Sequence, residues 1–287
     1  MARRLLLLGS TGKMGSAVRE VFGDGYDVIG VSSRDFDAAD SDRLTAFIEE
    51  TNPDIVVNTV AHLGIDSCEM NPGAAHRLNA LLPKHLAGLS RGKGYLLVHF
   101  STDAVFDDNK GDFYLESDQP NPLNVYGLTK YEGDRFVQAT AERYFLVRTS
   151  ILFGQATRRS QFVERMLVRA VEGNAPLRVA DDIVLSPSHA EDVAREVRRM
   201  LEGSCPFGLY HVANEGKATL YELMAEVVAG LGLDVPLERA SHRDFPAVGT
   251  KNTHTPLASE KIPPLRPWRE AVRAYCEKMT PGVHQDV

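Results

Sequence analysis

The chain has 287 residues, enough for one large domain or two modest ones with a sizeable buried core. Hydrophobic residues make up 43% of it and charged residues 25%, which is typical of a soluble globular protein. The formal net charge is −7, and no long basic run occurs. These features argue against a protein that binds nucleic acid.

Membrane and secretory segments are not indicated. The start, MARRLLLLGSTG, superficially resembles a signal peptide, but its apolar run Leu5–Leu8 is shorter than the roughly 7–15 residues required. No stretch approaches the ~20 apolar residues of a membrane span. The cysteines Cys68, Cys205 and Cys276 form neither a CxxC pair nor a disulfide framework. We therefore expect a cytoplasmic, reduced protein without a membrane partner.

Short apolar runs alternate with amphipathic stretches in the first half of the chain. The apolar runs predict strands at Leu5–Leu8, Asp27–Val31, Ile55–Val60, Leu96–Phe100 and Phe145–Val147. The amphipathic stretches predict helices at Met14–Phe22, Asp42–Glu50 and Pro72–Leu89. Alternation of this kind gives a parallel sheet with helices on both faces. The sequence therefore predicts an α/β fold, a doubly wound parallel (Rossmann) sheet.

The pattern changes beyond Gly154. We expect helices at Gln161–Val171, Glu191–Leu201 and Tyr221–Leu231, a strand at Leu209–Val212, and a tail rich in proline. This predicts a dinucleotide-binding domain over residues 1–153, to which parts of 186–216 return. A smaller C-terminal substrate-binding domain is expected over 154–287, at the carboxyl ends of the strands, where ligands bind to open α/β sheets.

A glycine loop joins the first strand to the first helix. In LLLLGSTGKMGSAV, Gly9, Gly12 and Gly15 allow a tight turn, close approach of a pyrophosphate and close packing of helix on strand. The helix N-terminus adds free N–H groups and the positive end of its dipole. A simple glycine-rich turn is the alternative. The position of the loop favours a dinucleotide site.

The end of the second strand indicates which dinucleotide is bound. An NAD site usually has an acidic residue there, whereas DVIGV runs into Ser32, Ser33 and Arg34. A guanidinium with two hydroxyls suits a 2′-phosphate. Asp35 and Asp37 lie nearby and weaken this argument, and Arg34 could be an exposed loop residue. We expect NADPH as the cofactor, with NADH possible.

Three side chains have the chemistry of a carbonyl reductase. Tyr126 and Lys130, in NVYGLTK, share one face if this segment is helical, and the cation is expected to lower the phenol pKa. Thr102 ends the strand that precedes them. During hydride transfer to a ketone, Tyr126 would donate a proton to the oxygen and Thr102 would hydrogen-bond it. A chance Tyr–Lys pair and a helix-capping turn are the alternatives.

Together these motifs resemble a known family. The segments GSTGKMG, NPDIVVNTVAH, RLNA, STDAVF, PLNVYGLTK and YFLVRTS are similar to those of the extended short-chain dehydrogenase/reductases, and more narrowly of the dTDP-4-dehydrorhamnose reductases. The resemblance implies NADPH-dependent reduction of the 4-keto group of a nucleotide-linked 4-keto-6-deoxy sugar. The implied partner is a nucleotide-sugar substrate, and a homodimer is possible.

The resemblance also implies roles for individual residues. Thr102, Tyr126 and Lys130 would be catalytic, and Asn79 would support the proton relay. The cofactor would contact Gly9, Gly12, Lys13, Met14, Gly15, Ser32, Ser33, Arg34, Asp37, Ala38, Ala61, His62, Leu63, Asn79, Tyr126 and Lys130. The substrate would contact Thr102, Asp103, Ala104 and Ile151. No metal site is implied for this chain.

Three departures from the family pattern concern the substrate, one of which is SQF at Ser160–Phe162, where relatives often have an Asn-Asn-Phe stretch. Ala104 stands where relatives usually carry an aromatic residue beside the sugar, and Ile151 stands where they carry a tryptophan. Loss of two aromatic walls removes apolar contact surface, so we expect a reshaped pocket.

Two other functions fit the same family of folds. One is a regulatory partner subunit that binds NADP, resembling that of methionine adenosyltransferase. The other is a sugar-nucleotide epimerase or dehydratase. The intact set of Thr102, Tyr126 and Lys130 favours an enzyme. A dehydratase is expected to carry an Asp-Glu pair after the strand-end threonine, whereas Asp103 is followed here by Ala104.

Overall fold

A six-stranded parallel sheet forms the centre of the molecule, for which a computed structural model describes residues 2–155, 162–172 and 176–279. The strand order is β2-β1-β3-β4-β5-β10. The strands are β1 (Arg3–Leu8), β2 (Tyr26–Val31), β3 (Ile55–Asn58), β4 (Leu96–Thr102), β5 (Tyr144–Thr149) and β10 (Gly208–His211). After β2 the chain returns to the other side of β1, so the winding reverses between β1 and β3. This confirms the doubly wound α/β fold and places its ligand crevice at that reversal.

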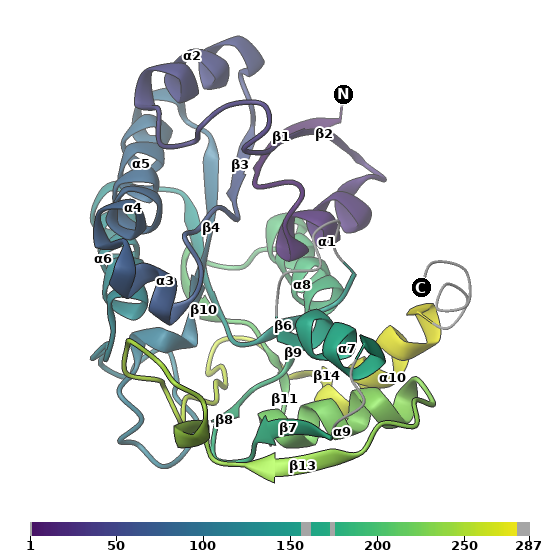
Figure 1. Ribbon diagram of the computed structural model, residues 1–287. Helices are drawn as coiled ribbons and strands as arrows, with labels where there is room; N and C mark the ends of the chain where they lie inside the picture. Colours follow the sequence, from purple (N-terminus) through teal and green to yellow (C-terminus); the bar gives the residue numbers. More distant parts are fainter. Residues whose placement is uncertain (1, 156–161, 173–175, 280–287) are drawn as a thin grey trace.

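Helices cover both faces of the sheet (Figure 1). One face carries α1 (Lys13–Phe22) and α8 (Ala190–Glu202), and the other carries α2 (Ser41–Thr51), α5 (Leu82–Lys93) and α6 (Val125–Thr140). Because successive strand residues point to opposite faces, Leu5 and Leu7 pack on the α1 side, whereas Leu6 and Leu8 pack on the α2 side. A strand buried on both faces therefore reads as an unbroken apolar run.

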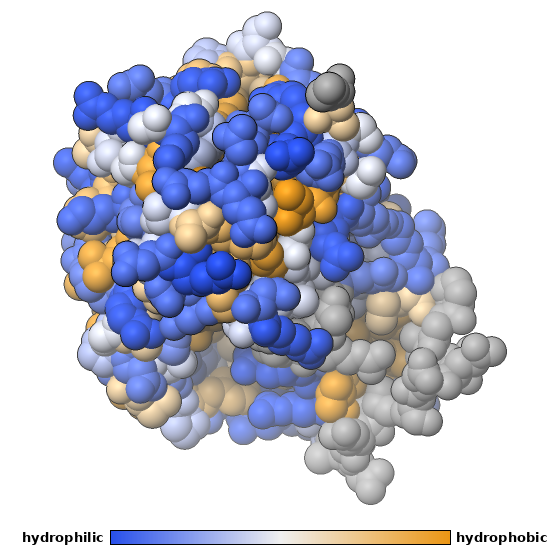
Figure 2. All heavy atoms as spheres, turned by 90° about the horizontal axis from the view of Figure 1, so that it is seen from above, coloured by the Kyte–Doolittle hydropathy of each residue, from blue (hydrophilic) through white to orange (hydrophobic). Residues whose placement is uncertain are grey.

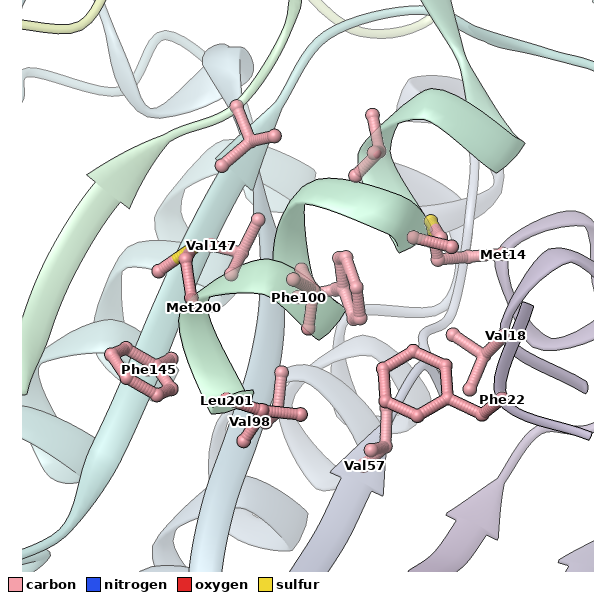
Figure 3. Packing of buried hydrophobic residues seen from close by; sticks show 14 of the residues in the cluster. Met14, Val18, Phe22, Val57, Val98, Phe100, Phe145, Val147, Met200 and Leu201 are labelled. Atoms are coloured by element: carbon pink, nitrogen blue, oxygen red, sulfur yellow. The ribbon is translucent and has the colours of Figure 1, made fainter. Parts of the chain in front are cut away.

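The apolar stripe of α1 docks this helix on the sheet. Met14, Val18 and Phe22 face Val57 of β3, with Met200 and Leu201 of α8 in the same cluster (Figure 3). Full burial of such a side chain contributes roughly 1.5–3 kcal/mol relative to exposure. The packing fixes the start of α1, and with it the glycine loop, against the end of β1.

Four strands end at other residues than the predicted apolar runs: β5 reaches Thr149 rather than Val147, β10 ends at His211 rather than Val212, and β3 and β4 also differ. β3 ends at Asn58 rather than Val60, because the Asn58 side-chain oxygen accepts a hydrogen bond from the Val60 N–H at 3.1 Å and turns the chain. β4 continues beyond Phe100 to Thr102, which pairs with Thr149 of β5. The predicted catalytic threonine is therefore the last residue of a central strand.

The helix expected over Pro72–Leu89 is interrupted. It consists of α4 (Pro72–His76), a π-helical turn at Arg77–Leu81, and α5. The turn packs tightly on α6, because a Cβ at Gly133 would lie 2.2 Å from the Asn79 carbonyl oxygen. A short helix that the sequence did not predict, α3 (Ile65–Met70), precedes α4.

The C-terminal part has a core of its own. Its helices are α7 (Phe162–Glu172), α9 (Leu220–Gly230) and α10 (Trp268–Met279), and Gln161, where the first was expected to begin, lies outside the described residues. Phe153, Val163, Trp268 and Tyr275 belong to the buried cluster between them. Among its described residues, four two-stranded sheets complete this part. They pair β6 (Leu152–Phe153) with β9 (Ser188–His189), β7 (Leu177–Ala180) with β13 (Leu237–Ala240), β8 (Val184–Leu185) with β12 (Ala218–Thr219), and β11 (Asn214–Glu215) with β14 (Leu265–Pro267).

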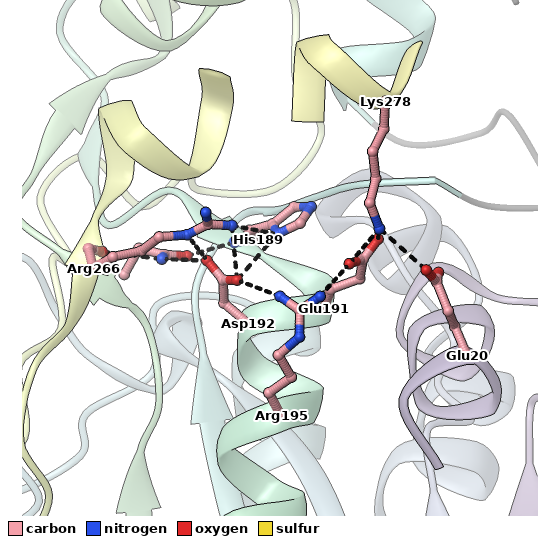
Figure 4. A network of polar contacts seen from close by, with 8 residues as sticks. Glu20, His189, Glu191, Asp192, Arg195, Arg266 and Lys278 are labelled. Carbon is pink, nitrogen blue, oxygen red and sulfur yellow. Dashed lines mark hydrogen bonds and ion pairs between the residues drawn. The ribbon is translucent and has the colours of Figure 1, made fainter. Parts of the chain in front are cut away.

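Ion pairs to two buried carboxylates, Glu191 and Asp192, join the C-terminal part to the sheet. Lys278 of α10 lies 2.6 Å from Glu191 of α8 and 3.1 Å from Glu20 of α1 (Figure 4). Arg266 of β14 binds Asp192 through two nitrogens at 2.7 and 2.9 Å. Burial alone would raise the pKa of Asp192, but hydrogen bonds from His189 and Arg266 outweigh it and hold this pKa far below its usual value. The two parts are thus connected through the first turn of α8.

Hydrophilic residues dominate the face seen from above, with small apolar areas between them (Figure 2). Within the described ranges, no helix is long and apolar enough to cross a membrane.

Candidate active site

The glycine loop is tightly wound between β1 and α1. Gly9 has a φ of +84°, and its N–H donates to the Val31 carbonyl at 2.9 Å. A Cβ at Gly15 would lie 2.1 Å from the Gly9 carbonyl oxygen, which only glycine avoids. No side chain of the described residues caps the first turn of α1. Its N–H groups and dipole can therefore receive an anionic group.

A small pocket of about 90 Å³ lies beside this loop, between the ends of β1, β2 and β3. It contains five residues expected from the sequence, which are Gly9, Ser32, Ser33, Asp37 and Ala38. Its remaining walls are apolar residues that sequence reasoning missed, namely Leu8, Val31, Phe36, Val60 and Leu78. Leu8, Val31 and Val60 were expected at the ends of predicted strands, and that position was the signal for a site. Phe36 and Leu78 lie outside the strands, and no signal in the sequence marked them. A flat apolar ring with polar edges fits such a pocket.

The polar groups after β2 are partly engaged with each other. Asp35 accepts hydrogen bonds from the Ser32 N–H at 2.7 Å and hydroxyl at 3.0 Å, which hold the pKa of Asp35 below its usual value. Arg34 is exposed, and Arg77 of the π-helical turn lies 3.7 Å from Asp37. Two guanidinium groups are thus present near the pocket, of which sequence reasoning had identified only Arg34.

Asn79 holds the loop that follows β3. It is fully buried, its side-chain oxygen accepts the His62 N–H at 2.8 Å, and its amide donates to the His62 carbonyl at 3.1 Å. The same amide donates to the Thr129 hydroxyl of α6 at 3.1 Å. These bonds fix the loop with Ala61, His62 and the exposed Leu63 relative to α6. The Asn79 side chain thus has a positioning role within the fold.

Thr102 and Asp103 form a hydroxyl–carboxylate cluster at the end of β4. The Thr102 hydroxyl donates to Asp103 at 3.1 Å and accepts the Ala104 N–H at 3.2 Å. The other Asp103 oxygen accepts the hydroxyls of Ser150 at 2.6 Å and Thr255 at 3.0 Å. Burial raises the pKa of Asp103, and the three hydroxyls oppose that shift. Sequence reasoning missed Ser150 and Thr255, which lie far away along the chain.

Tyr126 and Lys130 lie on the first turns of α6. Asn124 caps this helix by accepting the Gly127 N–H at 2.8 Å. The Lys130 ammonium is buried and donates to the Phe100 carbonyl of β4 at 2.6 Å. Burial lowers the Lys130 pKa to about 8, and the Asp134 carboxylate opposes this shift.

The expected lowering of the Tyr126 pKa is wrong. Burial raises this pKa above its usual value, a hydrogen bond with Thr102 opposes the shift, and the Asp103 carboxylate adds to it. The Lys130 ammonium donates to the Phe100 carbonyl, and the Asp134 carboxylate acts on the pKa of Lys130 itself. The geometry therefore favours a protonated phenol beside a threonine hydroxyl.

A buried ion pair connects α6 to the neighbouring strand β5. Arg148 of β5 donates to Asp134 of α6 at 3.0 Å, and both side chains are almost completely buried. Breaking such a pair on one side is costly because it leaves an uncompensated buried charge. The pair was not identified from the sequence.

The remaining predicted residues lie at the edges of this site. Ala104 is buried, and a Cβ at Gly127 would lie 2.1 Å from its carbonyl oxygen, so α6 contacts this turn directly. Ile151 is half-buried and packs against the C-terminal core. Met14 is buried in the core below the glycine loop. The Lys13 side chain is buried and binds Glu164 of α7. Within residues 2–155, 162–172 and 176–279, no three His, Cys, Asp or Glu side chains are grouped to hold a metal ion.

Comparison with known proteins matches nearly the whole chain. Residues 3–280 match the family model described as the RmlD substrate binding domain. The chain is 30% identical to the spore coat polysaccharide biosynthesis protein SpsK of Bacillus subtilis, over 96% of this chain and 97% of that protein. It is also 30% identical to the dTDP-4-dehydrorhamnose reductase of Mycolicibacterium smegmatis, over 95% and 85%. The crystal structure of dTDP-4-dehydrorhamnose reductase from Bacillus anthracis in complex with NADP is similar with a TM-score of 0.91, at 25% identity, and covers 97% of this chain and 100% of that chain.

Proposed function

The chain belongs to the RmlD substrate binding domain family, as the resemblance to dTDP-4-dehydrorhamnose reductases implied, and on this basis we propose that it reduces a keto group of a nucleotide-linked sugar. In its specific form, the reaction is NADPH-dependent reduction of the 4-keto group of a 4-keto-6-deoxy sugar. The observation that carries the proposal is the close packing of the first turn of α6, which carries Tyr126, on the turn that follows Thr102 at the carboxyl end of β4. This site adjoins the crevice where the winding of the sheet reverses.

The residues around the glycine loop fit a dinucleotide. A side chain at Gly15 would fill the space beside the Gly9 carbonyl, and the uncapped start of α1 suits a pyrophosphate. The apolar pocket with Ser32 and Asp37 at its edge fits an adenosine. Arg34 and Arg77 supply positive charge for a 2′-phosphate, which favours NADPH over NADH.

When bound, NADPH supplies the hydride for the carbonyl carbon. Tyr126 holds the proton that the carbonyl oxygen needs, and its raised pKa keeps the phenol protonated at neutral pH. Thr102 would turn its hydroxyl from Asp103 towards the carbonyl oxygen and stabilise the charge that develops there. Asp103 acts mainly by orienting Thr102, because its two oxygens already accept three hydroxyls.

Lys130 contributes a positive charge close to the end of β4, where it contacts the Phe100 carbonyl two residues before Thr102. Its bond to the Phe100 carbonyl ties α6 to β4, and thus keeps Tyr126 beside Thr102. Because the Lys130 pKa is lowered to about 8, the ammonium is mostly charged at neutral pH and loses its charge above that value.

The test is NADPH oxidation, followed by absorbance, with a panel of dTDP-, GDP- and UDP-linked 4-keto-6-deoxy sugars. We expect turnover with at least one sugar. NADPH binding without reduction of any member would contradict the reductase assignment and favour a cofactor-binding partner subunit.

A further inference from the structure

Lys13 was expected to contact the cofactor, but its side chain points elsewhere. It is the first residue of α1, directly after Gly12 of the glycine loop. Its ammonium lies 2.6 and 2.8 Å from the two carboxylate oxygens of Glu164 and 3.1 Å from the Leu152 carbonyl oxygen. A lysine ammonium has three hydrogens to donate, and these three acceptors use them all.

Both side chains of this ion pair are buried. The Lys13 side chain is 1% exposed and the Glu164 side chain 10%. Burial lowers the Lys13 pKa, while the charge and hydrogen bonds of Glu164 oppose this shift. A buried charge that loses its partner is strongly unfavourable, so each group holds the other in place.

The contacts connect three segments that surround the candidate site. Lys13 belongs to the glycine loop and α1, Leu152 directly follows Ile151, and Glu164 lies in the first turn of α7. The negative charge of Glu164 in the first turn of α7 is also favourable, because the N-terminus of a helix carries a partial positive charge. One ammonium thus connects the cofactor loop to both C-terminal segments next to the expected sugar pocket.

We infer that Lys13 is a positioning residue that transmits cofactor binding to the sugar-nucleotide site, and that it is not a ligand of the pyrophosphate. The inference rests on the proposed function for the identity of the two ligands. NADPH bound at the glycine loop would hold Leu152 and α7 in place through Lys13 and Glu164. Binding of the nucleotide sugar would in turn strengthen NADPH binding, since coupling between sites is reciprocal.

The test compares the wild type with Lys13→Met, Glu164→Gln and the double variant. NADPH affinity is measured by calorimetry. We expect Lys13→Met to weaken NADPH binding at least tenfold, because the uncompensated Glu164 carboxylate would add a negative charge close to the start of α1, where the pyrophosphate is proposed to bind. Glu164→Gln should change it less than threefold, and the double variant should return to within threefold of the wild type. A double variant as weak as Lys13→Met would identify Lys13 as a direct phosphate ligand and overturn the inference.

A second measurement addresses the coupling. The affinity for dTDP is determined with and without saturating NADPH. We expect NADPH to tighten dTDP binding at least fivefold in the wild type and less than twofold in the double variant. Equal coupling in both proteins would overturn the inference even if NADPH binding behaves as expected.

Thermal unfolding separates this inference from the proposed function. The double variant should unfold at a higher temperature than Lys13→Met, because it carries no unpaired buried charge. If the wild type bound no NADPH, the proposed function would fail while the ion pair would still be tested. Equal unfolding temperatures for the two variants would contradict the ion-pair argument itself.

Discussion

The Lys130 ammonium of α6 lies 2.6 Å from the Phe100 carbonyl oxygen of β4. This bond joins the helix that carries Tyr126 to the strand that ends in Thr102. Two residues that are 24 positions apart in the sequence are thereby brought to the same end of the sheet. The proposed reaction requires the Tyr126 phenol, the Thr102 hydroxyl and the Lys130 ammonium together.

Replacement of Tyr126 by phenylalanine removes the proton donor and leaves the ring in place. We expect turnover to fall by about 10²–10⁴-fold, the range typical of a general acid, with NADPH affinity changed less than threefold. Steady-state rates and calorimetry of the same preparation measure both. Full turnover in this variant would exclude Tyr126 as the donor.

The pH dependence of the reaction is expected to reflect Lys130. Its pKa is lowered to about 8, so the ammonium is charged below this pH and neutral above it. We therefore expect kcat/KM to be level near neutral pH and to fall as pH rises through about 8. Lys130→Met should be slow throughout and lack this descending limb. A wild-type profile that is level up to pH 10 would contradict a role for the charge.

Arg34 is expected to distinguish NADPH from NADH. Hydrogen bonds to charged groups contribute about 1.5–3 kcal/mol, and an exposed arginine lies at the lower end, so Arg34→Ala should raise KM for NADPH about tenfold. KM for NADH should change less than threefold. Arg91→Ala is the control, because this exposed arginine pairs with Glu142 where α5 ends, just before the amino end of β4 and away from the carboxyl ends of the strands. Equal effects on both cofactors would remove Arg34 from the 2′-phosphate site.

Gly15 is expected to tolerate no side chain. A Cβ there would lie 2.1 Å from the Gly9 carbonyl oxygen, so Gly15→Ala must displace the loop backbone. We expect a loss of about 1–3 kcal/mol in the free energy of unfolding and at least tenfold weaker NADPH binding. Gly73→Ala in α4 is the matched control, since no atom lies within 4 Å of its added methyl group. Similar behaviour of the two variants would show that the loop is looser than described.

The sheet could be predicted because its strands are buried on both faces. Runs such as Leu5–Leu8 and Ile55–Val57 are apolar without interruption, and only a central parallel strand buries every residue. The C-terminal sheets could not be predicted, since strands such as Val184–Leu185 are too short to show a period. Helix α10 was hidden by the prolines before it, although its buried residues from Trp268 to Cys276 follow a helical spacing.

The candidate site could be predicted as far as its residues lie within sequence motifs. The trio of Thr102, Tyr126 and Lys130 follows from strand ends and helical spacing. The Asp103 partners Ser150 and Thr255 are 47 and 152 positions away, so only the fold brings them together. The sign of the Tyr126 pKa shift was wrong because spacing along a helix does not reveal the depth of burial or the direction of a lysine side chain.

The most direct test of the central claim is hydride transfer itself. NADPH labelled with deuterium at the reactive nicotinamide position is incubated with the sugar nucleotide that supports turnover, and the product is analysed by mass spectrometry and NMR. We predict one deuterium at C4 of the sugar and a solvent-derived proton on the new hydroxyl oxygen. Product without deuterium at C4, or NADPH that remains unoxidised with every sugar tested, would contradict the reductase assignment.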